Sequence, residues 1–358
     1  MTGRHLPAAA IALALVALLA AGCGGASSSP LPASTAAPTQ HIAGITPTLE
    51  PSPTVERVEE PATPQITASR CADPYAGGAP YAPPPGQPLR LRPTGSAPPI
   101  ERFQPASIVQ DTGLEQIVRD SIGNQSSHFA VVIKNLADDT GVSIDPGRVF
   151  YPASLYKTWV MLEAFHQREA GLLDFAERYV ISSYYEQYRL NDGELEPCSE
   201  VTAGQALHVM MSVSDNVAAN LMYDRVGYSN VNQTLRELGL AYSGLVQGGD
   251  LLTTAGGTAT LMEAIARGRA VSPAASEEMN ALLESDVIND RLPALLPLGT
   301  RVAHKTGNWS NATHDGGIVF SPRATYVIVV LTDYGYAVDG GSRIARLSKA
   351  VYDYYNPS

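Results

Sequence analysis

The sequence is 358 residues long, carries a formal net charge of −11 at pH 7, and has 44% hydrophobic residues. Binding to nucleic acid or to an anionic membrane surface needs a basic surface that releases counterions, so this charge argues against both kinds of partner. The length allows one enzyme-sized domain with a substantial core beside a sizeable non-globular segment.

The first segment of the chain has the pattern of a secretory signal peptide. Arg4 and His5 precede an apolar run that ends at Ala21 and is too short for a transmembrane span. The run closes with LLAAGC, which resembles a bacterial lipoprotein signal, where small residues precede a cysteine that receives lipid. We therefore expect cleavage after residues 1–22 and export of a protein that Cys23 anchors to the outer face of the cytoplasmic membrane. A plain signal peptide with an incidental cysteine is the alternative.

Residues 23–106 are dominated by Pro, Ser, Thr, Ala and Gly. Such a segment cannot bury enough apolar surface to offset the entropy of ordering, so we expect a disordered tether. It would hold the folded part, residues 107–358, away from the membrane. Cys71 in the tether and Cys198 in the folded part could form a disulfide in an oxidising compartment, or remain two free thiols.

The folded part alternates between strand and helix patterns. Apolar spacing predicts a helix over 107–123, and HFAVVIKNL, the turn ADDTG and a strand from Val142 predict a hairpin. A helix from Ser154 to about Ala170 follows, and the chain is then mostly helical to about residue 295. DGGIVF and TYVIVVLT predict two more strands, and GSRIARLSKAVYDYY a final helix. Strands at both ends of a helical middle predict an α+β fold (an α/β sandwich), with an antiparallel sheet flanked by helices, an all-α lobe, and a cleft between them.

Three short motifs lie in order along the folded part: Ser154-Leu-Tyr-Lys157, Ser214-Asp215-Asn216 and Lys305-Thr306-Gly307. Ser-x-x-Lys alone has little weight, because a chain of this length contains about one by chance, and a capping serine with a solvated lysine is its ordinary reading. The other two motifs are rarer, and two of the four lysines of the chain fall within the motifs. Together and in this order they are the signature of class A β-lactamases and penicillin-binding proteins.

The residue types of the motifs suit nucleophilic catalysis. The dipole of a helix N-terminus favours the alkoxide of Ser154, and Lys157 lies three residues on along the same helix face. Lys157 must be partly neutral to act as a base, which burial and a second cation, Lys305, would promote. Ser214 can relay a proton to a leaving nitrogen. Asn216 can donate to and accept from a substrate amide.

Residues 107–356 resemble the secreted class A β-lactamase-related serine hydrolases in RVFYPASLYK, MMSVSDNVAANLMYDRVG, VNQTLRELGL and HDGGIVFSP. The resemblance implies the β-lactamase/transpeptidase-like fold, Ser154 as nucleophile and Lys157 as its base, with a structural role for Asp215. It also implies that HKTGN is an edge strand beside the cleft. There Lys305 and Thr306 would meet a substrate carboxylate, Gly307 would belong to the substrate-binding strand, and the N–H of Asn308 would complete the oxyanion hole with that of Ser154. We expect no cofactor, no metal and a monomer.

The sequence departs from the class A pattern before the third motif. Ser214 and Lys305 are 91 residues apart, which is shorter than is typical of class A enzymes. The Glu-x-x-Leu-Asn stretch whose glutamate activates the deacylating water is missing. Asp250 could serve as a substitute base, although an acid after Gly-Gly is more often a turn or cap residue. Without a base the acyl-enzyme would persist.

Two further positions have open interpretations. His314 lies where many family members have an arginine that grips the substrate carboxylate, and a histidine binds anions only when protonated. A structural histidine on a strand is the alternative. Tyr188 is the best candidate for an aromatic wall beside the cleft, and surface packing of the helical lobe is the alternative.

Three functions compete. The leading one is a lipid-anchored serine hydrolase that opens the β-lactam amide through a Ser154 acyl-enzyme. The second is a penicillin-binding-like D-alanyl-D-alanine peptidase or esterase that acts on a peptidoglycan stem peptide and deacylates slowly. The third is a non-catalytic cell-wall or antibiotic-binding protein, against which the intact motifs count. In each case the partner is a small molecule or peptide, and we expect the protein to contact the membrane only through its lipid anchor.

Overall fold

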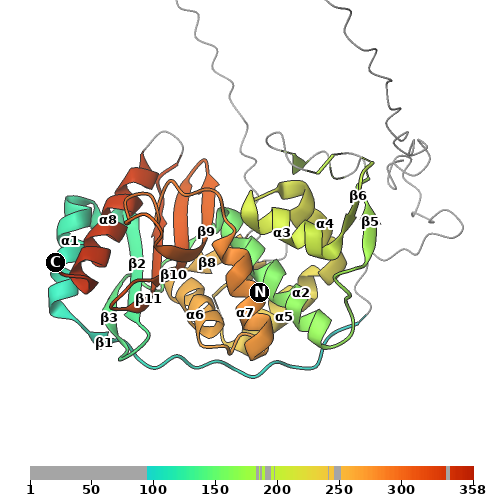
Figure 1. Ribbon diagram of the computed structural model, residues 1–358, viewed down its shortest axis with the longest axis horizontal. Helices are drawn as coiled ribbons and strands as arrows, with labels where there is room; N and C mark the ends of the chain where they lie inside the picture. The colour runs from blue at the N-terminus through green and yellow to red at the C-terminus, as the bar shows by residue number, and fades with distance from the viewer. Residues whose placement is uncertain are drawn as a thin grey trace, which may run out of the picture. The chain divides into compact units, whose positions relative to one another are not determined.

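The computed structural model describes residues 95–182, 185, 188–189, 195–196, 198–240, 242–245, 251–335 and 339–358 (Figure 1). The signal peptide, Cys23, Cys71 and Asp250 lie outside these residues, so what the sequence predicts for them stays a prediction. Cys198 is disulfide-bonded, which excludes a free thiol at this position. Its partner also lies outside the described residues, and pairing with Cys71 stays a prediction.

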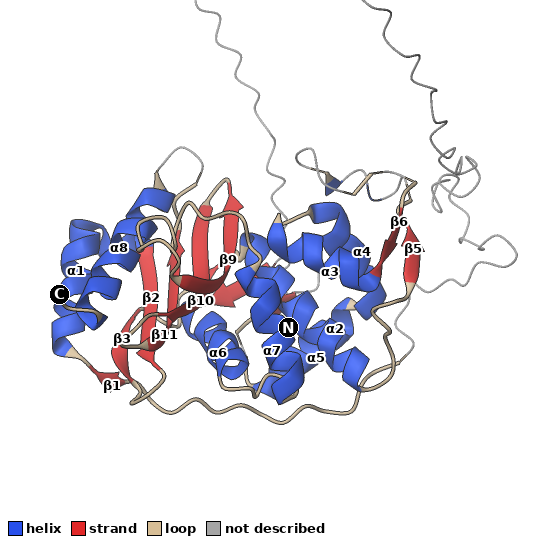
Figure 2. Ribbon diagram, viewed as in Figure 1, coloured by secondary structure: helices blue, strands red, loops and turns tan. Residues whose placement is uncertain are grey.

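One layer of the fold is a six-stranded sheet with the strand order β1-β3-β2-β11-β10-β9 (Figure 2). Its strands are β1 (Val109–Gln110), β2 (Phe129–Asn135), β3 (Thr140–Ile144), β9 (Arg301–Trp309), β10 (Ala312–Phe320) and β11 (Thr325–Thr332). All neighbours are antiparallel except the short β1, which pairs with β3 in parallel. The α+β fold with helices flanking this sheet is therefore confirmed.

Helices cover both faces of the sheet, and the central strands are apolar for that reason. Val131 and Ile133 of β2 belong to the core beneath α1 (Thr112–Ile122) and α8 (Gly340–Tyr355). Their neighbours in β2, Ala130 and Val132, belong to the other core, which includes α6 (Ala255–Ala266) and the helical lobe. Because successive side chains of a strand point to opposite faces, a near-continuous apolar strand such as TYVIVVLT fills both cores.

The helical lobe surrounds α2 (Lys157–Glu169), which is buried from Lys157 to Gln167. Around it lie α3 (Ala203–Ser212), α4 (Asn216–Val226), α5 (Tyr228–Leu238) and α7 (Pro273–Glu284). Short strands complete the lobe: β4 (Val149–Phe150), β5 (Arg178–Val180), β6 (Glu200–Thr202), β7 (Gly244–Leu245) and β8 (Leu251–Thr254). Within the described ranges, no helix is both long enough and apolar enough to cross a membrane.

Two predicted helix starts shift by a few residues. The helix expected from residue 107 begins at Thr112, because the Asp111 side chain caps it by accepting from the N–H of Leu114 at 3.0 Å. The helix expected from Ser154 begins as the 3₁₀ turn η3 (Ala153–Tyr156) and becomes α2 at Lys157. A second 3₁₀ segment, η2 (Gly123–His128), precedes β2. Tight first turns of this kind are common at helix ends.

Residues 95–106, which the composition assigns to the tether, pack on the domain instead. Figure 1 shows this segment running along the helical lobe towards the sheet. Phe103 is buried in the lobe core, and its N–H donates to the carbonyl of Leu238 at 3.0 Å. Lys134 Nζ on β2 donates to the carbonyl of Ala106 at 2.7 Å. Residues 95–106 therefore belong to the packed domain and not to the tether. The segment has no periodic apolar pattern, so the sequence gives no sign of its burial.

We expect Phe103→Ala to lower the free energy of unfolding by about 3–4 kcal/mol, because it empties a buried aromatic site. Tyr242→Ala is the matched control, since the side chain of Tyr242 is 74% exposed, and surface substitutions change stability by about 0.5 kcal/mol or less. Urea unfolding of the full chain measures both. Equal stability of the two variants would show that residues 95–106 are not part of the folded unit.

Candidate active site

Ser154 is the second residue of η3 and lies three residues before Lys157, the first residue of α2. Ala153 before it has φ +47°, a left-handed conformation that costs a residue other than glycine about 1–2 kcal/mol. The first N–H groups of a helix have no acceptor within the helix, and the helix dipole places partial positive charge at them. The strained turn thus presents Ser154 where a developing anion is favoured, as the sequence predicts.

The strand β9 lies directly against this turn at Gly307. A Cβ added at Gly307 would lie 2.8 Å from the carbonyl oxygen of Pro152 and 3.4 Å from Ala153 Cβ. Only glycine therefore lets β9 approach the nucleophile turn this closely. The strand order places β9 at the edge of the sheet, which confirms the expected edge strand HKTGN.

Lys157 brings the first two motifs together. Its buried Nζ lies 2.5 Å from the carbonyl oxygen of Ser214, 3.0 Å from Ser214 Oγ and 2.8 Å from Asn216 Oδ1. A charged ammonium can donate to all three oxygens. A neutral amine fits equally well, because the Ser214 hydroxyl can donate to its lone pair. The Ser214 hydroxyl is therefore a built-in proton path to and from Lys157.

The surroundings of Lys157 favour its neutral form. Burial, followed by the charge of Lys305, lowers the pKa of Lys157 well below its usual value, while Asp215 and Asp286 oppose the shift. Neither carboxylate is among the three oxygens that contact Lys157 Nζ. Burial without a contacting counter-charge disfavours an ammonium, so the lysine is poised to accept a proton.

The second motif is held by a helix start. Ser214 has φ +59°, and Asp215 caps α4 by accepting from the N–H of Ala218 at 2.7 Å. Asn216 is the first residue of α4. This geometry supports the structural role that the resemblance implies for Asp215. It also holds the neighbouring side chains, Ser214 and Asn216, against Lys157.

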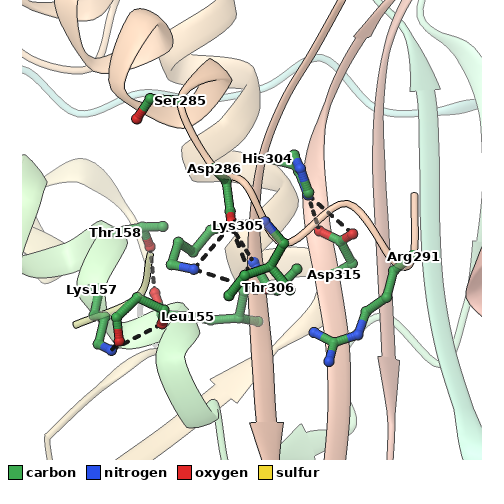
Figure 3. A network of polar contacts seen from close by, with 12 residues as sticks. Leu155, Lys157, Thr158, Ser285, Asp286, Arg291, His304, Lys305, Thr306 and Asp315 are labelled. Atoms are coloured by element: carbon green, nitrogen blue, oxygen red, sulfur yellow. Dashed lines mark hydrogen bonds and ion pairs between the residues drawn. The ribbon is translucent and has the colours of Figure 1, made fainter. Parts of the chain in front are cut away.

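Lys305 has a carboxylate partner that the sequence does not single out (Figure 3). Its fully buried Nζ lies 3.0 Å from Asp286 Oδ2, and the N–H of Thr306 donates to the same oxygen at 3.3 Å. Burial lowers the pKa of Lys305, and Asp286 opposes that shift. A buried lysine requires a counter-ion, but the sequence does not reveal which of the acids in ESDVIND provides it.

The prediction that His314 grips a substrate carboxylate is corrected. Its ring is buried, Nε2 lies 2.8 Å from the carbonyl oxygen of Tyr151, and Nδ1 accepts from the N–H of Thr332 at 3.1 Å. Burial lowers the pKa of His314 to about 4, so the ring is neutral and both nitrogens are occupied. His314 is a structural histidine that ties Tyr151, two residues before η3, to the sheet.

Arg291 is a second functional candidate that the sequence analysis missed. It is 5% exposed, and its Nη1 donates to the carbonyl of His314 at 3.2 Å. Its charge contributes to the lowered pKa of Lys305, which places the guanidinium within the field of that lysine. Arg291 thus places a buried cation against the backbone of His314. No motif marks it, because it lies in an irregular segment after α7.

The remaining predicted residues lie at the margins of the site. Asn308 is exposed on β9, and its Oδ1 accepts from Thr313 Oγ1 at 3.4 Å. Tyr188 is half-buried and packs against the lobe core, which fits the packing alternative. Across the described ranges, no group of three His, Cys, Asp or Glu side chains could hold a metal ion.

Comparisons with known proteins agree with this geometry. Residues 113–355 match a family model described as the beta-lactamase enzyme family. The extended-spectrum beta-lactamase PER-1 of Pseudomonas aeruginosa is 25% identical over 248 residues, which are 61% of this chain and 78% of that protein. The solved structure of PBP-A is 25% identical with a TM-score of 0.65, over 71% of this chain and 100% of that chain. A beta-lactamase from Sphaerobacter thermophilus is 23% identical and has the same fold, with a TM-score of 0.62 over 68% of this chain and 97% of that chain.

We expect Gly307→Ala to lower the free energy of unfolding by about 1–3 kcal/mol, because the added methyl group forces β9 away from η3. Gly147→Ala is the matched control, since a Cβ there would meet nothing within 4 Å. Chemical unfolding of both variants provides the comparison. If Gly307→Ala proved as mild as the control, β9 would not lie in tight contact with the nucleophile turn.

Proposed function

The chain belongs to the beta-lactamase enzyme family, and from this premise we propose that Ser154 opens the amide of a β-lactam ring as an acyl-enzyme. The family makes it a serine hydrolase of the class A-like kind. The observation that carries the proposal is the buried Nζ of Lys157, which lies 3.0 Å from Ser214 Oγ and 2.8 Å from Asn216 Oδ1. These contacts join a base with a lowered pKa to a proton relay, and Ser154 precedes that base by three residues.

The geometry supports the following sequence of steps. Neutral Lys157 takes the hydroxyl proton of Ser154, and the alkoxide attacks the ring carbonyl. The oxyanion accepts from the N–H groups of Ser154 and Asn308, the two donors that the resemblance implies. The C–N bond of the ring then breaks, and Ser214 passes the proton from Lys157 to the leaving nitrogen. The product of acylation is a Ser154 ester.

We assign the recognition of the substrate carboxylate to the third motif and its neighbours. Lys305 and Thr306 are held by Asp286, and the buried guanidinium of Arg291 adds a second positive charge near them. A carboxylate there would meet the cation of Lys305 and the hydroxyl of Thr306 in a site of low dielectric constant, where charged contacts are strong. Asn216 would hold the amide of the acyl side chain.

A penicillin-binding-like peptidase or esterase with slow deacylation is the second candidate. PBP-A has a TM-score of 0.65 with this chain, and a mutant of PBP-A with the same score was solved as an acyl-enzyme complex with penicillin-G. Both candidates share the Ser154 acylation step. They differ in whether a base such as Asp250 then activates water.

We also infer that the protein is exported and anchored to the membrane through lipid on Cys23. The basic start, the apolar run and the LLAAGC ending support this inference.

The proposal is tested by mixing the chain, without its signal peptide and Cys23, with a chromogenic cephalosporin. We expect a stoichiometric burst of colour and an intact-mass adduct, both lost in Ser154→Ala and kept in Ser121→Ala, which alters an exposed serine on α1. Sustained colour after the burst would identify a β-lactamase, and a stable adduct would identify the penicillin-binding-like candidate. Absence of burst and adduct would contradict both.

The acylation rate should rise with pH as Lys157 loses its proton, because only the neutral amine accepts the proton of Ser154. Lys305→Met removes a charge that lowers the pKa of Lys157, so the midpoint of the rising limb should move to higher pH. Lys134→Met is the matched control, since Lys134 is a buried lysine paired with Glu263 at 2.8 Å. Stopped-flow acylation across pH measures the midpoints. An unmoved midpoint in Lys305→Met would contradict the electrostatic coupling of the two lysines.

A further inference from the structure

A second buried polar cluster lies next to the third motif and has no part in the steps above. His304 Nδ1 lies 2.9 Å from Asp315 Oδ1 and 3.1 Å from Asp315 Oδ2, and the two side chains are 1% and 0% exposed. His304 precedes Lys305 on β9, and Asp315 pairs with Thr306 across to β10. The pair therefore flanks the strand residues that meet the substrate carboxylate.

The cluster ties an irregular segment, residues 286–292, to the sheet (Figure 3). His304 Nε2 lies 3.3 Å from Asn289 Oδ1, and the N–H of Leu292 donates to Asp315 Oδ2 at 3.0 Å. Two side chains of the sheet thus hold the segment at two points. A buried carboxylate with several donors has little freedom to move, so these ties fix the path of the segment.

The same segment carries the carboxylate partner of Lys305 and the buried Arg291. Asp286 at its start accepts from Lys305 Nζ at 3.0 Å, and Arg291 near its end donates to the carbonyl of His314 at 3.2 Å. Along the chain, the tied residue Asn289 lies between Asp286 and Arg291. The other tied residue, Leu292, directly follows Arg291. The positions of one carboxylate and one guanidinium at the anion-binding end of the site therefore depend on the ties to His304 and Asp315.

We propose that His304 and Asp315 are a positioning pair for binding of the substrate carboxylate. They hold segment 286–292 so that Asp286 stays on Lys305 and Arg291 stays on the carbonyl of His314. The proposal rests on the proposed function, because it concerns how that site binds its carboxylate substrate. Neither residue touches substrate in this role; both act through Asp286, Arg291 and Lys305.

The charges around His304 give the pair a pH signature. His304 faces Asp315 from β10, Asp286 from the segment and Lys305 on its own strand. Burial opposes the charged ring, but the charge and hydrogen bond of Asp315 outweigh it and raise the pKa of His304. When rising pH removes the proton of the His304 ring, the negative charge of Asp315 is no longer neutralised. This charge lies next to the residues that bind the substrate carboxylate. The affinity for a carboxylate substrate should therefore fall with rising pH.

Two variants separate position from charge. Asp315→Ala removes the ties to both His304 and Leu292. His304→Asn keeps a donor for Asp315 but cannot titrate. Glu263→Gln is the matched control, because it breaks a distant buried ion pair, with Lys134 on β2. Each variant is assayed for the substrate dissociation constant and the saturating acylation rate with a chromogenic cephalosporin across pH, and for the ¹⁵N signal of Lys305 Nζ.

We expect Asp315→Ala to raise the dissociation constant about tenfold, with a smaller change in the saturating acylation rate, and to shift the Lys305 signal. His304→Asn should retain the Lys305 signal and lose the fall in affinity with rising pH. Glu263→Gln should lose stability only. If Asp315→Ala behaves like Glu263→Gln, or if His304→Asn keeps the pH dependence, the proposal is overturned. If wild type forms no adduct, the proposed function fails, while the Lys305 signal still decides the positioning role.

Discussion

The site depends on one electrostatic constraint. Two lysines are buried close enough together that the charge of Lys305 lowers the pKa of Lys157. Lys305 has a carboxylate in contact, Asp286, at 3.0 Å. Among the described residues, Lys157 Nζ contacts the oxygens of Ser214 and Asn216 and no carboxylate. Because a buried charge is stable only when it is paired, this asymmetry divides the two roles. Lys305 remains the cation that receives a substrate anion, and Lys157 becomes the amine that receives a proton.

The fold brings these two lysines together from different layers. Lys157 begins α2, the buried centre of the helical lobe, whereas Lys305 lies on β9 at the edge of the sheet. The two layers meet at Gly307, where the absence of a side chain allows β9 to reach the turn that carries Ser154. Two residues nearby have left-handed backbone conformations: Ala153, which lies at this contact, and Ser214, which contacts Lys157. Strain at these positions is the cost of placing nucleophile, base and relay within reach of one another.

The sequence predicts the part of this arrangement that is local along the chain. Apolar alternation and helical spacing give the sheet and its flanking helices, and the three motifs give Ser154, Lys157 and Lys305. The sequence does not predict interactions made through space. Asp286 and Arg291 lie in an irregular segment without periodicity, and only the folded chain shows that they surround Lys305. The sequence leaves the two interpretations of His314 open, because the resemblance gives a position on a strand but not the contacts of the ring. Residues 95–106 are missed because an extended segment can be buried by a single aromatic residue, Phe103, without any repeating pattern.

The central claim is that Lys157 loses its proton more readily than Lys305. The chain has only four lysines, Lys134, Lys157, Lys305 and Lys349, so the ¹⁵N signals of their side-chain nitrogens can be assigned by single substitutions and followed through a pH titration. The account predicts that Lys157 titrates well below the ordinary lysine pKa of about 10.4 and loses its proton before Lys305 does. A Lys157 signal that titrates at the ordinary value, or after Lys305, would contradict its role as the base.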